Sequence, residues 1–197
     1  MIRLFSLLAL VSALLSGCVQ YVVVEPKRTA IQGVMTVEPQ IAWNKAGNAP
    51  GAADSASTAE VWTVDGPLLH ALSFYAGVAD GQALAKPRPG TEEKLPVFKS
   101  SMAPNDVMDL LESTIARISS STVIKSRNLR GAKLGGQDGF RFELTYVLKD
   151  EVEREATAVG TIRNGKLVMI LYQGAKLHYF QKYLPPVEQL IESVQFL

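Results

Sequence analysis

The C-terminal half of the chain alternates apolar and polar residues with the two-residue period of a β-strand. The apolar members of the first such run are Phe140, Phe142, Leu144 and Tyr146. This alternation gives a strand one buried and one solvated face, as in antiparallel sheets. Asn164 and Gly165 form a favoured two-residue hairpin sequence between strands expected at 153–163 and 167–172. This half of the chain therefore predicts an antiparallel meander.

Two segments have the spacing of amphipathic helices. Residues 104–118 begin with Pro104, which suits a first helical position. One face of this segment carries Val107, Leu110, Leu111, Thr114, Ile115 and Ile118. A final helix is expected to start at Pro186, after a helical turn within 176–183. Its apolar face would carry Val187, Leu190, Ile191 and Val194.

The rest of the chain predicts short strands and loops. A pair of strands is expected within 33–45 and single strands at 60–65, 68–75 and 123–129, with loops at 46–59, 85–97 and 131–139. A hairpin through Asp65 and Gly66 would join the strands on either side of it. Helices that stand apart from a mainly antiparallel sheet make an α+β layered fold.

Four segments carry a resemblance to a known family. Residues 74–84, 139–142, 165–167 and 191–194 resemble members of the PsbP-like superfamily. That superfamily groups the extrinsic PsbP subunit of photosystem II with a Ran-binding nuclear-import factor and many bacterial envelope proteins. The resemblance covers residues 31–197 and implies an α/β/α sandwich around an antiparallel sheet. It also implies binding or assembly rather than catalysis, although a shared fold does not fix function. No metal or partner motif of the family is present to carry over.

The N-terminus resembles a bacterial lipoprotein signal. Residues 15–18 read Leu-Ser-Gly-Cys, Arg3 supplies the positive start, and residues 5–15 form an apolar core. That core is too short to span a bilayer, which needs roughly 20 apolar residues. The resemblance implies a diacylglyceryl thioether on Cys18, cleavage before it and acylation of the new amino group. The signal peptide would then be residues 1–17.

Acylation of Cys18 would attach the mature protein to a membrane. We expect 18–30 to be a lipidated tether that can add an edge strand, and 31–197 to be the domain. Two or more acyl chains anchor a protein stably, whereas one does not. Val19 follows the cysteine where an Asp would resemble an inner-membrane retention signal, which favours the outer membrane facing the periplasm. The alternative is a plain secretory signal or an N-terminal anchor in which Cys18 is incidental.

Net charge argues against nucleic acid as a partner. The chain has 20 Lys and Arg against 19 Asp and Glu, and removing 1–17 takes away Arg3 and leaves the two signs equal in number. Nucleic-acid binding needs a basic surface that releases phosphate counterions. The densest basic stretch holds Lys125, Arg127, Arg130 and Lys133. Lys125 and Arg127 share a strand face and are the candidate contact with a protein partner, the alternative being an ordinary exposed strand.

The sequence offers no catalytic constellation, metal site or cofactor motif. His70 lies in a strand pattern among leucines, which indicates a structural or sheet-edge role, and His178 stands beside Tyr179. Neither has the spacing of a metal site. Glu151, Glu153 and Glu155 alternate along an expected strand, and we interpret them as a solvated face rather than an acid–base pair.

Four aromatic residues offer a different kind of site. Trp43, Trp62, Phe74 and Tyr75 could line a ligand cleft, but aromatic residues at strand spacing are more typical of a core. A lone cysteine excludes a disulfide framework.

The favoured hypothesis is therefore a non-enzymatic, lipid-anchored periplasmic module that binds an envelope protein. The alternative is a carrier of small molecules or lipids with an apolar cleft between sheet and helix. A cell-wall hydrolase is the least favoured of the three.

Overall fold

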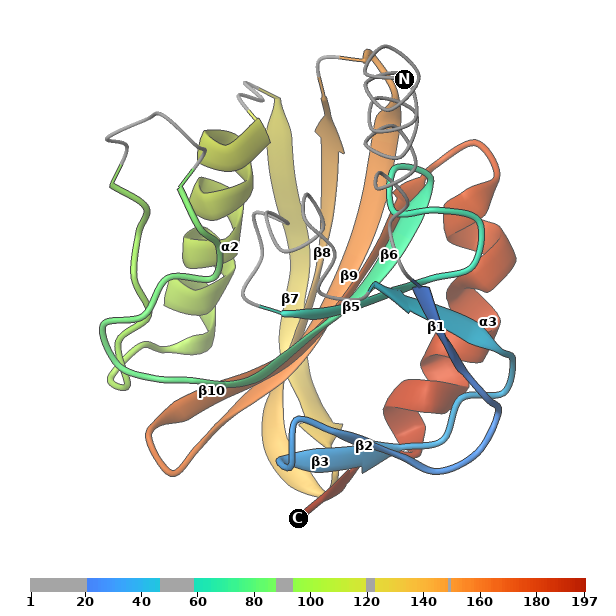
Figure 1. Cartoon of the computed structure of the whole chain (residues 1–197). Coiled ribbons are helices and arrows are strands. Elements are labelled where there is room, and N and C mark those ends of the chain that lie inside the picture. The colour runs from blue at the N-terminus through green and yellow to red at the C-terminus, as the bar shows by residue number, and fades with distance from the viewer. Residues whose placement is uncertain (1–20, 47–58, 88–93, 120–122, 149) are drawn as a thin grey trace, which may run out of the picture.

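The computed structural model describes residues 21–46, 59–87, 94–119, 123–148 and 150–197. Its centre is an eight-stranded sheet in which every neighbouring pair is antiparallel (Figure 1). From edge to edge the strands are β1 (Tyr21–Val24), β4 (Trp43–Ala46), β5 (Glu60–Thr63), β6 (His70–Val78), β10 (Lys166–Ala175), β9 (Glu153–Arg163), β8 (Gln137–Val147) and β7 (Ile124–Leu134). Cys18 and the expected signal peptide at 1–17 lie outside the described residues.

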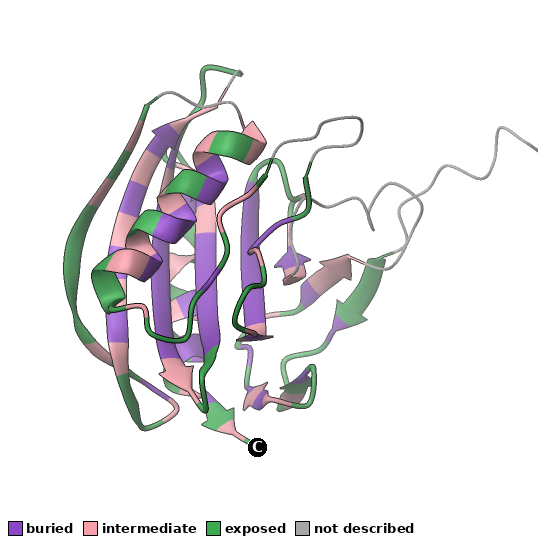
Figure 2. Cartoon of the chain, turned by 90° about the vertical axis from the view of Figure 1, so that its left-hand side faces the viewer, coloured by how far each residue is buried: buried purple, intermediate pink, exposed green. Residues whose placement is uncertain are grey.

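Two helices cover opposite faces of this sheet, which confirms the α/β/α sandwich. Helix α2 (Pro104–Ser119) packs mainly on β7 and β8, and α3 (Tyr179–Glu192) packs mainly on β10 and β9. The buried side of α2 faces the strands and its exposed side faces away from them (Figure 2). The alternating residues Phe140 to Tyr146 belong to the α2 core. The α3 core contains Val168, Ile170 and Tyr172 of β10. Among the described residues, no helix combines the length and apolarity needed to cross a bilayer.

Tight turns connect the strands of the C-terminal meander. Asn164 and Gly165 have φ values of 52° and 71°, so the predicted hairpin is confirmed. The predicted loop at 131–139 is wrong, because β7 continues to Leu134 and β8 begins at Gln137. Only Gly135 and Gly136 form the turn, with φ values of 54° and 78°. The other glycines of this segment lie within the strands.

The predicted start of the last helix is also wrong. Helix α3 begins at Tyr179, so Pro185 and Pro186 lie inside it. Each proline removes one backbone donor from the helix. Burial of Phe180 and Tyr183 with the later apolar residues of α3 favours the helix in spite of this loss. The helix predicted at 104–118 is confirmed, and the side chain of Asp106 accepts a hydrogen bond from the amide of Ala103 at its start.

The strands on either side of Asp65 are antiparallel neighbours, but their bounds differ from the prediction. Strand β5 ends at Thr63 and β6 begins at His70, so the connection is longer than the two-residue turn expected. The imidazole Nε2 of His70 accepts hydrogen bonds from the backbone amides of Val64 and Asp65, which holds this connection away from the sheet ladder.

A second, three-stranded sheet joins the two ends of the described chain. It consists of β2 (Thr29–Ile31), β3 (Met35–Val37) and β11 (Gln195–Phe196), with β3 in the middle. Two predicted strands within 33–45 correspond to β3 and β4, which belong to different sheets. The pairing of β11 with β3 brings the C-terminus beside the N-terminal strands.

Candidate functional site

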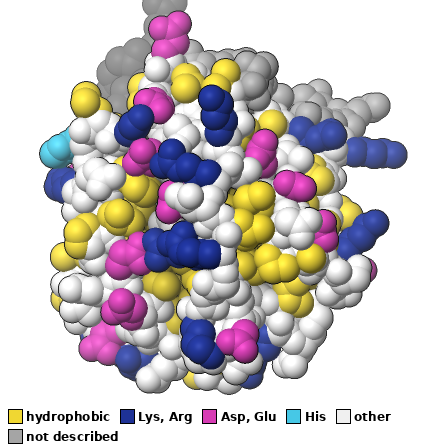
Figure 3. Space-filling view, turned by 180° about the vertical axis from the view of Figure 1, so that it is seen from behind, with side chains coloured by type: hydrophobic (Ala, Val, Ile, Leu, Met, Phe, Trp, Pro, Cys, Tyr) yellow, Lys and Arg dark blue, Asp and Glu magenta, His cyan; other side chains and the backbone are white. Residues whose placement is uncertain are grey.

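Helix α3 leaves part of its face of the sheet uncovered, and a hollow of about 270 Å³ lies between the helix and strands β7, β8 and β9. We call it the α3 groove. It is lined by Arg127, Arg141, Glu143, Leu144, Glu155, Ala156, Thr157, Phe180, Gln181 and Leu184. Seen from behind, the molecule intermixes basic and acidic side chains and shows no field of one sign (Figure 3).

Strand register explains why charged residues line this groove. Arg127 of β7 lies opposite Glu143 of β8, which lies opposite Thr157 of β9. Lys125 lies opposite Thr145, one step along the same face. Lys125 and Arg127 therefore share a face, as predicted. Arg127 lines the groove, whereas Lys125 lies beyond the residues that line it.

Arg127 is held by acidic side chains of the groove. Its Nε lies 3.2 Å from Oε2 of Glu143, and its Nη2 lies 3.9 Å from Oε1 of Glu155. Arg130 approaches the other oxygen of Glu143 at 3.7 Å. Asn128 donates a hydrogen bond of 2.9 Å to Glu143, from a bulge at which its own φ is 57°. The basic stretch is thus neutralised locally, so an anionic partner would have to compete with Glu143 and Glu155.

Glu143 stays ionised in this setting. Desolvation alone would raise the pKa of Glu143, but hydrogen bonds from Asn128 and Arg127 and the charges of Arg127 and Arg130 outweigh it. The net effect lowers the pKa of this carboxyl below its usual value. A carboxylate in this state accepts hydrogen bonds well and is a poor general acid or base near neutral pH.

Arg141 connects the floor of the groove to α3. Its guanidinium forms a two-point ion pair with Glu188, with Nη1 2.7 Å from Oε2 and Nη2 against Oε1. The Nε of Arg141 and the hydroxyl of Thr157 are buried without a hydrogen-bond partner among the described residues. Buried polar atoms are normally hydrogen-bonded, so these two atoms retain unused hydrogen-bonding capacity in residues that line the groove.

The histidines do not come together. His70 is 1% exposed in β6, and its ring stacks on Tyr183 with the ring centroids 4.2 Å apart. Burial lowers the pKa of His70 to about 4, against the opposing charge of Asp65. His178 is exposed and precedes α3. In the described part of the chain, no cluster of three His, Cys, Asp or Glu residues could hold a metal ion.

The row of three glutamates is only partly a strand face. Glu151 has a φ of 60° and lies in the turn before β9. Glu153 pairs with Lys176 at 2.9 Å. Glu155 enters the α3 groove, where it also accepts a hydrogen bond of 3.3 Å from Gln181. The partners of Glu153 and Glu155 among the described residues are Lys176, Gln181 and Arg127, and none of these is a histidine.

The aromatic residues considered for a cleft belong to the core. None of Trp43, Trp62, Phe74 and Tyr75 is more than 6% exposed. Trp62 and Phe74 pack edge to face with ring centroids 4.7 Å apart. These side chains therefore fill the layers on both sides of the sheet rather than line a cleft.

The sequence predicts one side of the α3 groove, the β7 face that carries Arg127, and does not predict the sides formed by β8, β9 and α3. The alternation in 140–146 predicts that its polar members, which include Arg141 and Glu143, lie on the solvated face of the strand, but nothing local places them beside α3. The alternation that identified β8, combined with the β8–β9 register, would have put Glu143 beside Thr157. The position of α3 along the sheet has no such local signal.

Comparison with solved structures identifies the fold. No family model matches the sequence, and no curated protein sequence matches it either. The solution structure of cyanobacterial PsbP (CyanoP) from Synechocystis sp. PCC 6803 is similar with a TM-score of 0.55 at 14% identity, over 92% of this chain and 95% of that chain.

A second structure is more distant. LpqN, described as involved in cell envelope biogenesis of Mycobacterium tuberculosis, aligns with a TM-score of 0.40 at 9% identity, over 94% of this chain and 95% of that chain. At these values only the first comparison shows a common architecture. The protein described here has the PsbP-like α+β fold, with two helices packed on an eight-stranded antiparallel sheet.

Proposed function

We propose that the chain is a lipid-anchored module of a bacterial cell envelope that binds a protein partner and catalyses no reaction itself. One observation carries the proposal. Strand order puts β1, which begins three residues after Cys18, at one edge of the large sheet and β7 at the other. An acylated Cys18 would hold the first edge at the membrane and present the second edge, with the α3 groove, to the periplasm.

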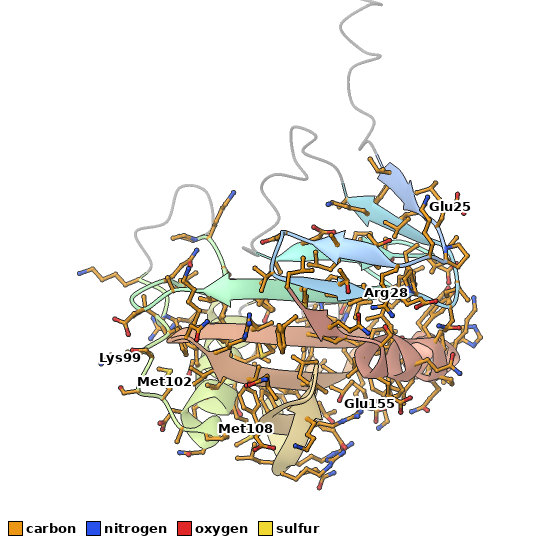
Figure 4. All side chains as sticks on the ribbon, turned by 90° about the horizontal axis from the view of Figure 1, so that it is seen from below. Glu25, Arg28, Lys99, Met102, Met108 and Glu155 are labelled. Carbon is orange, nitrogen blue, oxygen red and sulfur yellow. The ribbon has the colours of Figure 1, made fainter. Side chains whose placement is uncertain are left out.

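The separation of the two edges supports this arrangement. Neighbouring strands lie about 4.8 Å apart, so the eight strands span on the order of 30 Å. Viewed from below, the blue N-terminal strands and the tan strands β7 and β8 lie at opposite ends of the molecule (Figure 4). Glu25, which follows β1, lies near the first end, and Glu155 of the groove lies toward the second.

The chemistry of the groove supports a protein partner. Its side chains offer paired charges of both signs, together with a buried hydroxyl and a buried guanidinium nitrogen that lack partners among the described residues. Polypeptides carry donors, acceptors and charges of both signs that can complement such a lining. Its charged lining does not favour the apolar carrier, whose site would be mostly hydrophobic.

The state of the titratable groups supports a non-enzymatic role. Glu143 is ionised with a lowered pKa, and the imidazole Nε2 of His70 is occupied by two backbone amides. General acid–base catalysis favours a group whose pKa lies near the working pH and that reaches the substrate.

Val19 after Cys18 supports the outer membrane as the site of anchoring.

Cross-linking in intact envelopes followed by purification tests the proposal. The acylated wild-type protein is expected to retain an envelope protein that a Lys125→Glu/Arg127→Glu variant retains several-fold less. Lys133→Glu is the matched control, because Lys133 is exposed on the same strand and, among the described residues, forms its ion pair with exposed Asp138 at the hairpin end. The control is expected to behave as wild type.

Two results would contradict this function. One is equal retention by wild type and the double variant. The other is turnover of peptidoglycan or an ester by the purified domain that is lost in Glu153→Gln or His178→Ala.

A further inference from the structure

Strand β1 is an apolar edge without the protection that the opposite edge has. Tyr21, Val22 and Val23 are 42%, 59% and 57% exposed, and β4 is the only strand beside β1 among the described residues. The opposite edge strand, β7, carries four basic residues and a bulge. Charges and bulges are the usual means by which proteins keep an edge strand from pairing with other chains. We therefore expect another molecule or surface to cover the apolar side chains of β1.

The chain between Cys18 and β1 is too short to hold the domain away from a membrane. Only Val19 and Gln20 separate Cys18 from Tyr21. An extended residue spans at most about 3.6 Å, so these three steps cover at most about 11 Å. Because Tyr21 is already hydrogen-bonded into the sheet beside β4, the first residue of the folded domain stays within this distance of the acylated residue.

We propose that β1 rests on the lipid surface to which Cys18 is attached, with the side chains of Tyr21, Val22 and Val23 in contact with lipid. This inference rests on the acylation of Cys18 in the proposed function. It names the lipid bilayer as the covering of this edge and fixes which edge of the sheet faces the membrane.

Backbone chemistry sets the depth of the contact. The outer edge of β1 carries amide and carbonyl groups that no described strand pairs, and such groups are strongly disfavoured in hydrocarbon. The strand therefore lies at the level of the headgroups, where water remains available. Tyr21 suits this depth, because tyrosine rings concentrate at membrane interfaces. Charge adds little to the contact, since the exposed residues Glu25 and Lys27 that follow have opposite signs and exposed Arg28 pairs with Glu38 at 2.9 Å.

Site-directed spin labelling of the acylated full-length product tests this placement. Acylation occupies Cys18, so Val22→Cys introduces the only free thiol, and Leu129→Cys supplies a matched exposed position on β7. The proteins are reconstituted in vesicles of phosphatidylethanolamine and phosphatidylglycerol. The label at position 22 is expected to be several-fold less accessible to a water-soluble nickel complex than the label at 129, and more accessible to oxygen. Insertion of a Gly-Ser segment after Gln20 should reduce this protection.

Several outcomes would overturn the inference. Equal nickel accessibility at positions 22 and 129 would mean that β1 stays in water. Spin–spin broadening between labels at position 22 would instead show that a second copy covers the edge. Protection that requires an added envelope protein fraction would indicate a partner strand. Incorporation of labelled palmitate is measured in parallel, so that loss of acylation, which defeats the proposed function, is distinguished from an acylated protein whose β1 is exposed.

Discussion

His70 connects the N-terminal strands to α3 through its ring. Its Nε2 accepts backbone hydrogen bonds of 3.2 Å from Val64 and Asp65, so the proton of the neutral ring resides on Nδ1. Tyr183 stacks on the ring, and its hydroxyl donates to Asp65, which also pairs with Lys182. Protonation of Nε2 would remove the acceptor that holds the β5–β6 connection. The neutral ring is therefore part of the native structure.

This arrangement predicts a specific loss of stability in acid. The pKa of His70 is about 4 in the folded protein against 6.5 when unperturbed, so between these pH values the unfolded chain binds a proton that the native protein does not. The contribution of His70 is present above pH 6.5 and is lost as the pH falls to 4, by about 3 kcal/mol at most. Urea unfolding of the chain lacking residues 1–18 is expected to show this slope, and His70→Gln should flatten it. Parallel pH profiles for the two proteins would contradict the prediction.

Gly139 of β8 and Gly160 of β9 lie where the structure leaves no room for a side chain. A Cβ atom on Gly139 would lie 2.1 Å from the backbone oxygen of Gly160, and one on Gly160 would lie 2.8 Å from the ring of Phe140. Backbone cannot give way as a flexible side chain can. Glycine at position 139 is thus a packing requirement between elements rather than a turn signal.

We expect Gly139→Ala to destabilise the domain by about 1–3 kcal/mol or more, because the added methyl group overpacks the β8–β9 pair. Gly131→Ala is the matched control in neighbouring strand β7, since a Cβ atom there would meet nothing within 4 Å. Its effect should stay within about 0.5 kcal/mol. Denaturant midpoints of the two variants measure the difference. Similar midpoints would mean that β8 and β9 can shift apart at Gly139 with little loss in the free energy of unfolding.

Local signals predicted most of the elements and failed where packing competes with them. The alternation of apolar and polar residues predicts β8, and the Asn164–Gly165 pair predicts the β9–β10 turn. The apolar face of residues 104–118 predicts α2 with bounds that are correct to within a residue or two. The four glycines of 131–139 suggested a loop because glycine has the same local signature in a turn and in a crowded strand. Pro186 suggested a helix start because burial of residues on both sides of it cannot be seen locally.

Residues 195–197 join the C-terminal end of the described chain to the small N-terminal sheet. Gln195 and Phe196 pair with Thr36 and Met35, and the amide of Leu197 donates to the carbonyl of Val34. The guanidinium of Arg163 lies 5.0 Å from the centre of the Phe196 ring. A segment of a few residues thus connects the small sheet to the end of the β9–β10 hairpin.

Removal of residues 195–197 should therefore lower the free energy of unfolding of the domain by about 1–3 kcal/mol, which is more than expected for three residues of an unpaired terminus. The largest local effect is expected in β3. Hydrogen exchange is expected to accelerate at β3 amides and to change little in the centre of β9 and β10. Leu197→Ala is the control, because it keeps the backbone and changes a side chain that is 62% exposed. Uniform acceleration across the sheet would show that β11 supports the fold as a whole instead.

Long-range contacts also explain why the site could be predicted only in part. Lys125 and Arg127 could be placed on one face from their spacing alone. That Arg127 meets Glu143 and Glu155 depends on the pairing of three strands. The groove depends in addition on the position of α3, which packs mainly on β10 and β9 and supplies Phe180, Gln181 and Leu184 to the lining. The basic stretch that the sequence suggests is therefore neutralised in the structure, because the strand register places Glu143 and Glu155 beside its arginines.

The order of the strands has a consequence for folding during synthesis. Strand β3 pairs with β11, and among the described strands the pairing of β6 with β10 joins the N-terminal part of the large sheet to the rest. In a chain that emerges N-terminus first, neither sheet can be completed before the last thirty or so residues are free, because both need strands from that end. A prematurely terminated chain would lack the β6–β10 and β3–β11 pairings, so its N-terminal strands would each keep an unpaired edge and be open to proteases.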